Sequence, residues 1–218
     1  MYEYPDHDPR RRIWNAALKH FSTSGYAGTG VQQIVDDAGV TKPTLYYHFG
    51  SKAELYSKLI ESAYTERLKV IEAAAATSGD IEGQLTAVGD ALLDFAKRHK
   101  ERVRLCYSTT FAGPGELPPG VDTAQKGLRL FRFIQSIILA AIDRGELSNK
   151  TSAEELTTAI FSQYMILSIT AVLMPESLKP GIVARLVQIY LDGARKCSSV
   201  EQEESVKAVI HALNPPAA

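Results

Sequence analysis

The sequence predicts an all-α protein with an N-terminal three-helix helix-turn-helix domain and a larger C-terminal helical domain. Apolar residues recur at helical spacing along most of the chain, and no segment alternates apolar and polar residues over the length of a strand. The chain has 218 residues, of which 45% are apolar and 22% charged. This composition is that of an ordinary globular protein with a sizeable core.

Cap and stop residues divide the first part of the chain into helices. Asp8 and Pro9 suit the N-cap and the first helical position, and Gly25 supplies the stop. Gly39 and Gly50 end two short helices in the same way, and Thr41 is a good cap for the second of them. Ser51 and Glu54 have capping-box spacing at the start of a longer helix. The predicted helices therefore span about residues 9–24, 31–38, 42–49 and 52–76.

A polar break at residues 77–80 separates this part from the rest of the chain. Beyond it, periodicity predicts helices at about 81–98, 101–112, 121–144, 152–174, 181–197 and 200–213. A Gly/Pro loop at 113–120 interrupts them. We therefore predict an N-terminal domain at 1–55, a connector helix at about 52–76, and a C-terminal domain at 77–218.

The helix that follows Thr41 carries side chains suited to DNA. Two short helices joined by a glycine-containing turn are the basic pattern of a helix-turn-helix, but many helical proteins contain such a pair. Short donors and one cation stand in the first turn, where they can reach phosphates and base edges; they are Thr41, Lys42 and Thr44. Tyr46, Tyr47 and His48 can donate to phosphate oxygens, and Lys52 lies at the next helix N-terminus. On composition alone, core packing is an equally good explanation of the Tyr-Tyr-His run.

The same residues carry a resemblance. Gly25-Tyr26 and the segment VQQIVDDAGVTKPTLYYHFGSKAEL at 31–55 resemble the N-terminal signature of the tetracycline-repressor (TetR) family over about residues 10–60. The resemblance implies an all-helical homodimer whose N-terminal domains read DNA and whose C-terminal domains bind a ligand and dimerise. The implied DNA-contacting positions are Thr29, Gln32, Thr41, Lys42, Pro43, Thr44, Tyr46, Tyr47, His48 and Lys52.

Two positions depart from the family pattern. Gly30 stands where a serine or threonine commonly caps the second helix, so a phosphate contact there is expected to be lost or shifted to Thr29. Pro43 replaces a frequent small residue, stiffens the turn and removes one N–H donor.

The C-terminal helices offer amphipathic faces rather than a motif. Apolar and aromatic side chains with a few hydroxyls and amides predict a pocket for an apolar or aromatic small molecule. The candidates are Cys106, Tyr107, Thr110, Phe111, Phe131, Gln135, Gln163, Tyr164 and Leu167. Simple core packing is the bland alternative for Phe and Leu at this spacing. Gln135, Gln163 and Tyr164 are the better pocket candidates, because an amide or phenol on an apolar face needs a partner.

Helices 152–174 and 181–197 are the predicted homodimer interface. The first is apolar around much of its circumference, and the second has Ile182, Leu186 and Ile189 on one stripe. A two-fold dimer would place two recognition helices about 34–36 Å apart on a palindromic operator.

Together these features predict a ligand-responsive transcriptional repressor that is released from its DNA operator by a small, largely apolar effector. The alternative is a helical small-molecule-binding protein without DNA activity. No nucleophile–base pair or metal-ligand spacing is apparent, so we expect no enzyme, metal or cofactor. The formal net charge of -1 excludes a non-specific nucleic-acid coat. Two distant cysteines and the lack of a signal or membrane segment predict a cytoplasmic protein without membrane partners.

Overall fold

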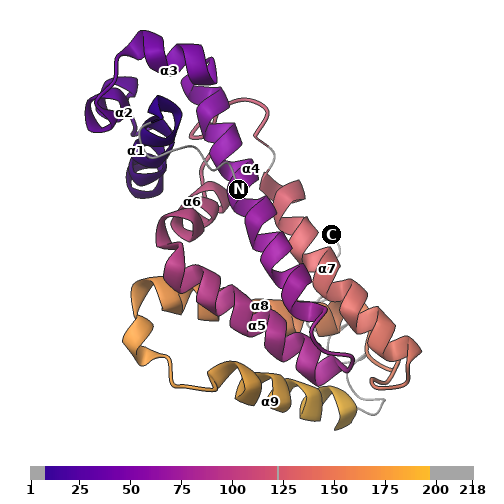
Figure 1. Ribbon diagram of the computed structural model, residues 1–218. Coiled ribbons are helices and arrows are strands. Elements are labelled where there is room, and N and C mark those ends of the chain that lie inside the picture. Colours follow the sequence, from indigo (N-terminus) through magenta and orange to yellow (C-terminus); the bar gives the residue numbers. More distant parts are fainter. Residues whose placement is uncertain (1–7, 122, 197–218) are drawn as a thin grey trace, which may run out of the picture.

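A computed structural model describes residues 8–121 and 123–196, and within these ranges the chain folds into nine α-helices and one 3-10 turn. The first three helices are short and lie together at one end of the molecule (Figure 1). They are α1 (Pro9–Ser24), α2 (Val31–Ala38) and α3 (Lys42–Phe49). The long α4 (Lys52–Ala75) runs from them into the rest of the protein.

The remaining helices form a larger bundle at the other end (Figure 1). They are α5 (Ile81–Arg98), α6 (Lys100–Thr110), α7 (Thr123–Asp143), α8 (Ala153–Leu173) and α9 (Ile182–Lys196), with the 3-10 turn η1 (Pro175–Ser177) between the last two. α5 lies at the centre of this bundle, because it packs against α4, α8 and α9 and also touches α7. The all-helical fold predicted from the sequence is confirmed.

Helix boundaries agree with the predicted ones to within two residues for every described helix. The helix ends are set by the cap and stop residues that the sequence predicts. Asp8 accepts a hydrogen bond from the Arg10 N–H at 2.8 Å, and Gly39 ends α2 in the left-handed conformation with φ of 61°. Ser152 and Glu155 form a capping box at the start of α8. The helix predicted at 200–213 lies outside the described residues.

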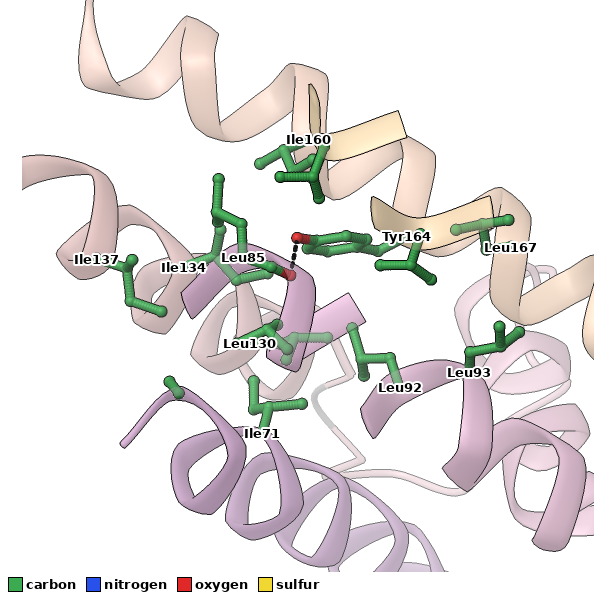
Figure 2. Close-up of a cluster of buried hydrophobic side chains, with 14 of the residues drawn as sticks. Ile71, Leu85, Leu92, Leu93, Leu130, Ile134, Ile137, Ile160, Tyr164 and Leu167 are labelled. Carbon is green, nitrogen blue, oxygen red and sulfur yellow. Dashed lines mark hydrogen bonds between the residues drawn. The ribbon is translucent and has the colours of Figure 1, made fainter. Parts of the chain in front are cut away.

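Two apolar clusters form the interior. The smaller one packs α1, α2, α3 and the first half of α4 around Phe21, Ile34 and Leu45, which are fully buried. The larger one joins α5, α7, α8 and α9 to the end of α4, and Figure 2 shows part of it. α6 contributes to both clusters, because Leu105 belongs to the smaller and Val103 to the larger. α4 and α6 are therefore the elements that join the two ends of the molecule.

One described helix, α8, is long and apolar enough by length and composition to cross a membrane. Core helices of packed bundles pass the same test. In this protein 44% of the apolar window of α8 is buried, and Ile160, Tyr164 and Leu167 lie in the larger cluster (Figure 2). Packing within the bundle therefore explains the apolar side chains on the buried part of α8.

Candidate nucleic-acid interface

The helix α3 is held by its apolar side and presents the other side to solvent. Leu45 is fully buried and Phe49 is 3% exposed, four residues further along the same face. The Phe49 ring lies 6.2 Å from that of Trp14 on α1. Between these anchors, Tyr46 is 44% exposed and Tyr47 is 85% exposed. Tyr47 is an aromatic side chain that the protein keeps almost wholly in solvent, and this favours contact with a partner over core packing.

The N-terminus of α3 is closed by two hydroxyls. Thr41 accepts a hydrogen bond from the Thr44 N–H at 3.4 Å, and the Thr41 and Thr44 hydroxyl oxygens lie 2.9 Å apart. Lys42 and Pro43 are exposed beside them in the first turn of the helix. Thr41 therefore acts as the cap that the sequence predicts. Of the two hydroxyls, the Thr44 hydroxyl is the more covered by neighbouring atoms.

His48 is half-buried at the end of the same helix and has a partner that the sequence analysis did not include. The Arg10 Nε donates to the His48 Nδ1 at 3.3 Å, across 38 positions of sequence. The Tyr47 and His48 rings lie 5.0 Å apart in an edge-to-face arrangement. The N-terminus of α1 therefore lies beside the C-terminal half of α3.

Three consecutive arginines, Arg10, Arg11 and Arg12, are exposed in the first turn of α1. Arg12 donates from Nη1 to the Gly39 carbonyl at 3.3 Å, in the turn between α2 and α3. Sequence reasoning weighed the positive charge of this surface from its lysines alone and missed these cations. The signal that could have found them is the basic run itself, next to a predicted cap.

Lys52 begins α4 on the same end of the molecule. Its Nζ lies 4.2 Å from the centre of the Tyr26 ring, and partial burial lowers the pKa of its ammonium group. Ser51 caps the helix by accepting from the Glu54 N–H at 3.1 Å. The ring of Tyr26 thus holds a cation at a helix N-terminus, where backbone N–H groups favour an anion.

At the start of α2, the structure differs from the contacts expected for Thr29 and Gly30. Thr29 is 2% exposed, and its hydroxyl donates to the Gly25 carbonyl at 2.7 Å, so the expected shift of a phosphate contact to this side chain is wrong. Gly30 lacks a capping side chain, but its N–H donates to the Gln33 Oε1 at 2.7 Å. Gln32 is exposed, and its amide donates to Asp36 at 2.7 Å. Gln33 therefore stabilises the start of α2, while Gln32 faces solvent.

The described residues include an ion pair that fixes α1 against α2. Lys19 Nζ lies 3.0 Å from the Asp37 Oδ2, and this hydrogen bond lowers the pKa of the Asp37 carboxyl. Such exposed pairs contribute little stability, but they help to hold an orientation. The three short helices and the start of α4 therefore form one surface with Tyr47, Lys42, Lys52 and the arginines of α1 on its outside.

The residues expected to line a ligand pocket divide into separate groups. Tyr164 is a core residue, because it is 2% exposed and its hydroxyl donates to the Leu85 carbonyl at 2.6 Å (Figure 2). Leu167 lies in the same cluster (Figure 2). Phe111 is 79% exposed at the end of α6 and lines no interior space. Core packing explains the places of Tyr164 and Leu167, and Phe111 is exposed, so their role as pocket lining stays a prediction.

A second group of these residues lies on α6. Cys106 is buried in the smaller cluster, where burial raises the pKa of its thiol to about 11. Tyr107 turns towards α8, where its hydroxyl donates to the Met165 carbonyl at 3.1 Å. Thr110 donates to the Cys106 carbonyl at 2.9 Å, and its hydroxyl oxygen lies 3.4 Å from that of Tyr64. Tyr107 and Thr110 therefore connect α6 to α8 and to α4, respectively.

The last group lies on α7 and α8. Phe131 packs edge-to-face on Phe161, with ring centres 5.6 Å apart, and Gln135 is half-buried one turn along α7. The Gln163 Oε1 is buried with no hydrogen-bond partner among the described residues. The structure does not bring all nine expected pocket residues together.

Comparisons with known proteins identify the N-terminal part of the chain. Residues 13–59 match the family described as bacterial regulatory proteins, tetR family. The transcriptional activator FasR of Mycolicibacterium smegmatis is 30% identical over 120 residues, which are 55% of this chain and 55% of FasR. The transcriptional repressor SCO4008 of Streptomyces coelicolor is 31% identical over 110 residues, which are 50% of this chain and 54% of SCO4008. The matched region thus spans about half the length of these relatives.

The whole fold also has a known counterpart. A bacterial regulatory protein in the tetR family from Rhodococcus RHA1 superposes with a TM-score of 0.69, at 20% identity, over 88% of this chain and 99% of that one. At this identity the likeness concerns the fold. Residues 13–59 therefore match the tetR family of bacterial regulatory proteins, and the whole chain has the fold of a solved tetR-family protein.

Proposed function

We propose that the chain is a ligand-responsive transcriptional regulator, a repressor that binds a palindromic DNA operator as a homodimer in the cytoplasm. The observation that carries this proposal is the outside of α3. Tyr47 is 85% exposed on a helix whose other face is anchored by a fully buried Leu45, with cations on the helices to either side. A rigid helix presenting donors and cations fits a major groove, where phosphate contacts position it and base contacts select the sequence.

The proposed DNA contacts follow from exposure. Lys42, Pro43, Tyr46 and Tyr47 are exposed on α3, and Thr44 is half-buried beside them. Gln32 on α2, Lys52 on α4 and the arginines of α1 border them and are suited to phosphate contacts. Thr41 contributes to DNA binding by capping α3, and His48 contributes by its hydrogen bond with Arg10.

The proposed domains meet within α4. Residues 1–55 are the DNA-binding domain, residues 52–76 are the connector, and residues 77–218 bind ligand and dimerise. In support, Leu55 and Tyr56 belong to the smaller cluster, whereas Ile71 and Ala75 belong to the larger. α6 is a second connection, since the Tyr56 hydroxyl and the Thr109 hydroxyl share a buried hydrogen bond of 2.8 Å.

Ligand response is proposed to be a shift between two dimer conformations. A small effector that binds better to the conformation with mismatched recognition helices lowers operator affinity by its difference in binding free energy. α4 and α6 transmit the change, because each is packed into both clusters. Displacement of α6 would shift Leu105 and Cys106, which belong to the smaller cluster of the DNA-binding domain.

The homodimer is proposed to form through α8 and α9. Ile166, Leu173 and Ile189 are each more than 60% exposed on these two helices. Large apolar side chains gathered on one face favour a protein partner, and a second copy of this chain supplies the same face. The predicted dimer interface thus lies at the end of the molecule opposite to α3 (Figure 1).

The test is binding of the full chain to the DNA that flanks its own gene, followed by footprinting. We expect protection of a palindromic site. Tyr47→Ala and Lys52→Ala should each weaken binding about ten-fold, the loss of one charge-assisted hydrogen bond. Lys52→Ala should also reduce the salt slope by about one unit. Both variants should melt as the wild type does.

The matched control is Lys69→Ala, which removes an exposed lysine of the same helix far from α3. This variant should bind the operator as the wild type does. Unchanged operator affinity in the Tyr47 and Lys52 variants would show that α3 and the start of α4 are not the reading surface.

A further inference from the structure

The side chain of Arg67 is buried in the apolar face of α4. It is 6% exposed and stands in register with Tyr64 one turn before it and Ile71 one turn after it, both of them buried. Among residues 8–121 and 123–196, the other buried polar side chains are threonines and a serine. Arg67 is therefore the one buried side chain in these ranges that carries a charge. Burial of an ion is costly unless an opposite charge compensates it.

The contacts of Arg67 within the described part of the chain include no carboxylate. Its Nη2 lies 3.8 Å from the Met165 Sδ, and a thioether is a weak, neutral acceptor. Two carboxylates of α4 that precede it are engaged elsewhere, and the one that follows it, Glu72, is exposed. Glu66 pairs with Arg102 of α6, and Glu61 pairs with Lys126 and with Arg129 of α7, the latter at 3.0 Å. The negative charges of this part of α4 therefore serve other cations.

The groups around Arg67 stay neutral at physiological pH. Burial raises the pKa of the Tyr64 and Tyr107 hydroxyls, and it raises the pKa of the Cys106 thiol to about 11. The charge of Arg67 opposes each of these shifts without reversing them. These side chains can donate or accept hydrogen bonds, but none of them supplies a negative charge.

The surroundings thus match an anion with an apolar body. Arg67 provides a planar fork of N–H groups that fits a carboxylate in a two-point contact. The Tyr107 hydroxyl interacts with the Arg67 side chain while it donates to the Met165 carbonyl, and the Tyr64 hydroxyl on the same face of α4 is a further possible donor. Met165 and the apolar faces of α4 and α8 surround them.

We propose that Arg67 binds the carboxylate of the effector, and that the effector is an amphipathic organic acid. This inference rests on the proposed ligand response and names the chemistry of its ligand. The same contact places the ligand between α4, α6 and α8. There the acid would hold Tyr107 of α6 and Arg67 of α4 together. α4 and α6 are the two helices that contribute buried residues to both clusters, and they therefore connect the ligand to the DNA-binding domain.

The experiment compares matched acids and alcohols on the full chain. The probes are straight-chain carboxylates from hexanoate to tetradecanoate, the primary alcohols of the same lengths, and cinnamate with cinnamyl alcohol. Thermal shift and calorimetry give binding to the wild type and to Arg67→Met, which keeps the volume and removes the charge. We expect the wild type to prefer acids, and Arg67→Met to lose acid affinity by about thirty-fold or more while its affinity for alcohols does not fall.

Three further variants and measurements keep the result decisive. Arg104→Met removes an exposed arginine of α6 and should bind the acids as the wild type does. Arg67→Lys keeps the charge without the fork and should retain part of the acid preference. Without any probe, Arg67→Met should melt at or above the wild-type temperature, because it removes a buried charge that lacks a carboxylate, whereas Arg102→Met should melt lower because it strands Glu66.

Several outcomes would overturn the inference. Equal acid affinity in the wild type and in Arg67→Met would do so, and so would a wild type that binds only alcohols or none of the probes. A purely structural Arg67 would show itself as a large fall in the melting temperature of both Arg67 variants. Operator binding by the wild type is measured separately. If the chain binds acids through Arg67 but binds no operator, the proposed function fails and the acid site stands.

Discussion

At the scale of single residues, neighbours in sequence have opposite environments, and the geometry of the helix explains why. Leu45 is fully buried and Tyr47 is 85% exposed, although only Tyr46 separates them. Residues two apart on an α-helix point in nearly opposite directions, so an anchored leucine dictates an outward tyrosine. The same rule places Arg67 inside, because it shares a face with Tyr64 and Ile71. Helix register, rather than residue chemistry, puts a cation in the interior.

Cys106 gives a prediction at this scale. Burial raises the pKa of its thiol from the ordinary value of 9.0 to about 11, so the unreactive protonated form predominates in the folded protein at neutral pH. In a Cys197→Ser variant, a disulfide reagent should label Cys106 extremely slowly in the native state and completely in denaturant. The native rate should continue to rise as the pH passes 9.0, because the thiolate fraction grows until the pH reaches the folded pKa. Fast labelling at neutral pH would show that α6 leaves the smaller cluster readily.

Much of the reading surface could be predicted from the sequence, and what could not depends on long-range contacts. The Thr41 cap, the exposed Tyr47 and the buried Leu45 follow from spacing within a few residues. The contact of Arg10 with His48 joins positions 38 apart, and the burial of Thr29 depends on how the turn after α1 folds back. Neither has a local signal. Arg67 does have a local signal, because a cation interrupts an apolar stripe of α4. That Glu61 and Glu66 pair with other cations can be seen only in the folded chain.

At the scale of helices, local caps set where each helix begins and ends, whereas small residues set how closely two helices approach. Gly89 lies at the centre of α5, facing Tyr164 of α8 and Val183 of α9. A Cβ built at Gly89 would stand 2.5 Å from the Val183 Cγ1 and 2.7 Å from the Tyr164 Cε1. The absence of a side chain therefore lets α8 and α9 pack on α5 from two directions. Sequence periodicity predicts α5 but does not identify this glycine as the contact point.

Gly89→Ala tests this close packing. The added methyl group has no room, so we expect a loss of about 1–3 kcal/mol in the free energy of unfolding despite the better helix propensity of alanine. The matched control is Gly127→Ala on α7, where a Cβ meets no atom within 4 Å. This control should gain about 0.5–1 kcal/mol. Denaturant melts measure both. Equal stabilisation by the two substitutions would mean that α5 is packed more loosely than the structure shows.

At the scale of the molecule, α3 and the helix pair of α8 and α9 lie toward opposite ends of the subunit (Figure 1). α4 and α6 cross between them, and each contributes buried residues to both clusters. A dimer formed through α8 and α9 would fix the distance between the two copies of α3. DNA binding would then depend on an interface that touches no DNA, because two half-sites about one helical turn apart must be met together. A ligand bound between the two ends, as proposed above, would change that distance.

The dimer interface gives the prediction for the whole molecule. Ile166 is 62% exposed and Ile189 is 65% exposed, so Ile166→Glu with Ile189→Glu should leave the fold intact but introduce charges into the interface. We expect the double variant to sediment as a monomer and to bind the operator about a hundred-fold more weakly or worse, since the two half-sites are no longer bound as one unit. Leu139→Glu is the matched control, because Leu139 is 48% exposed on α7, which is not one of the two proposed interface helices. The control should remain a dimer with full operator affinity, whereas a double variant that stays dimeric would place the interface elsewhere.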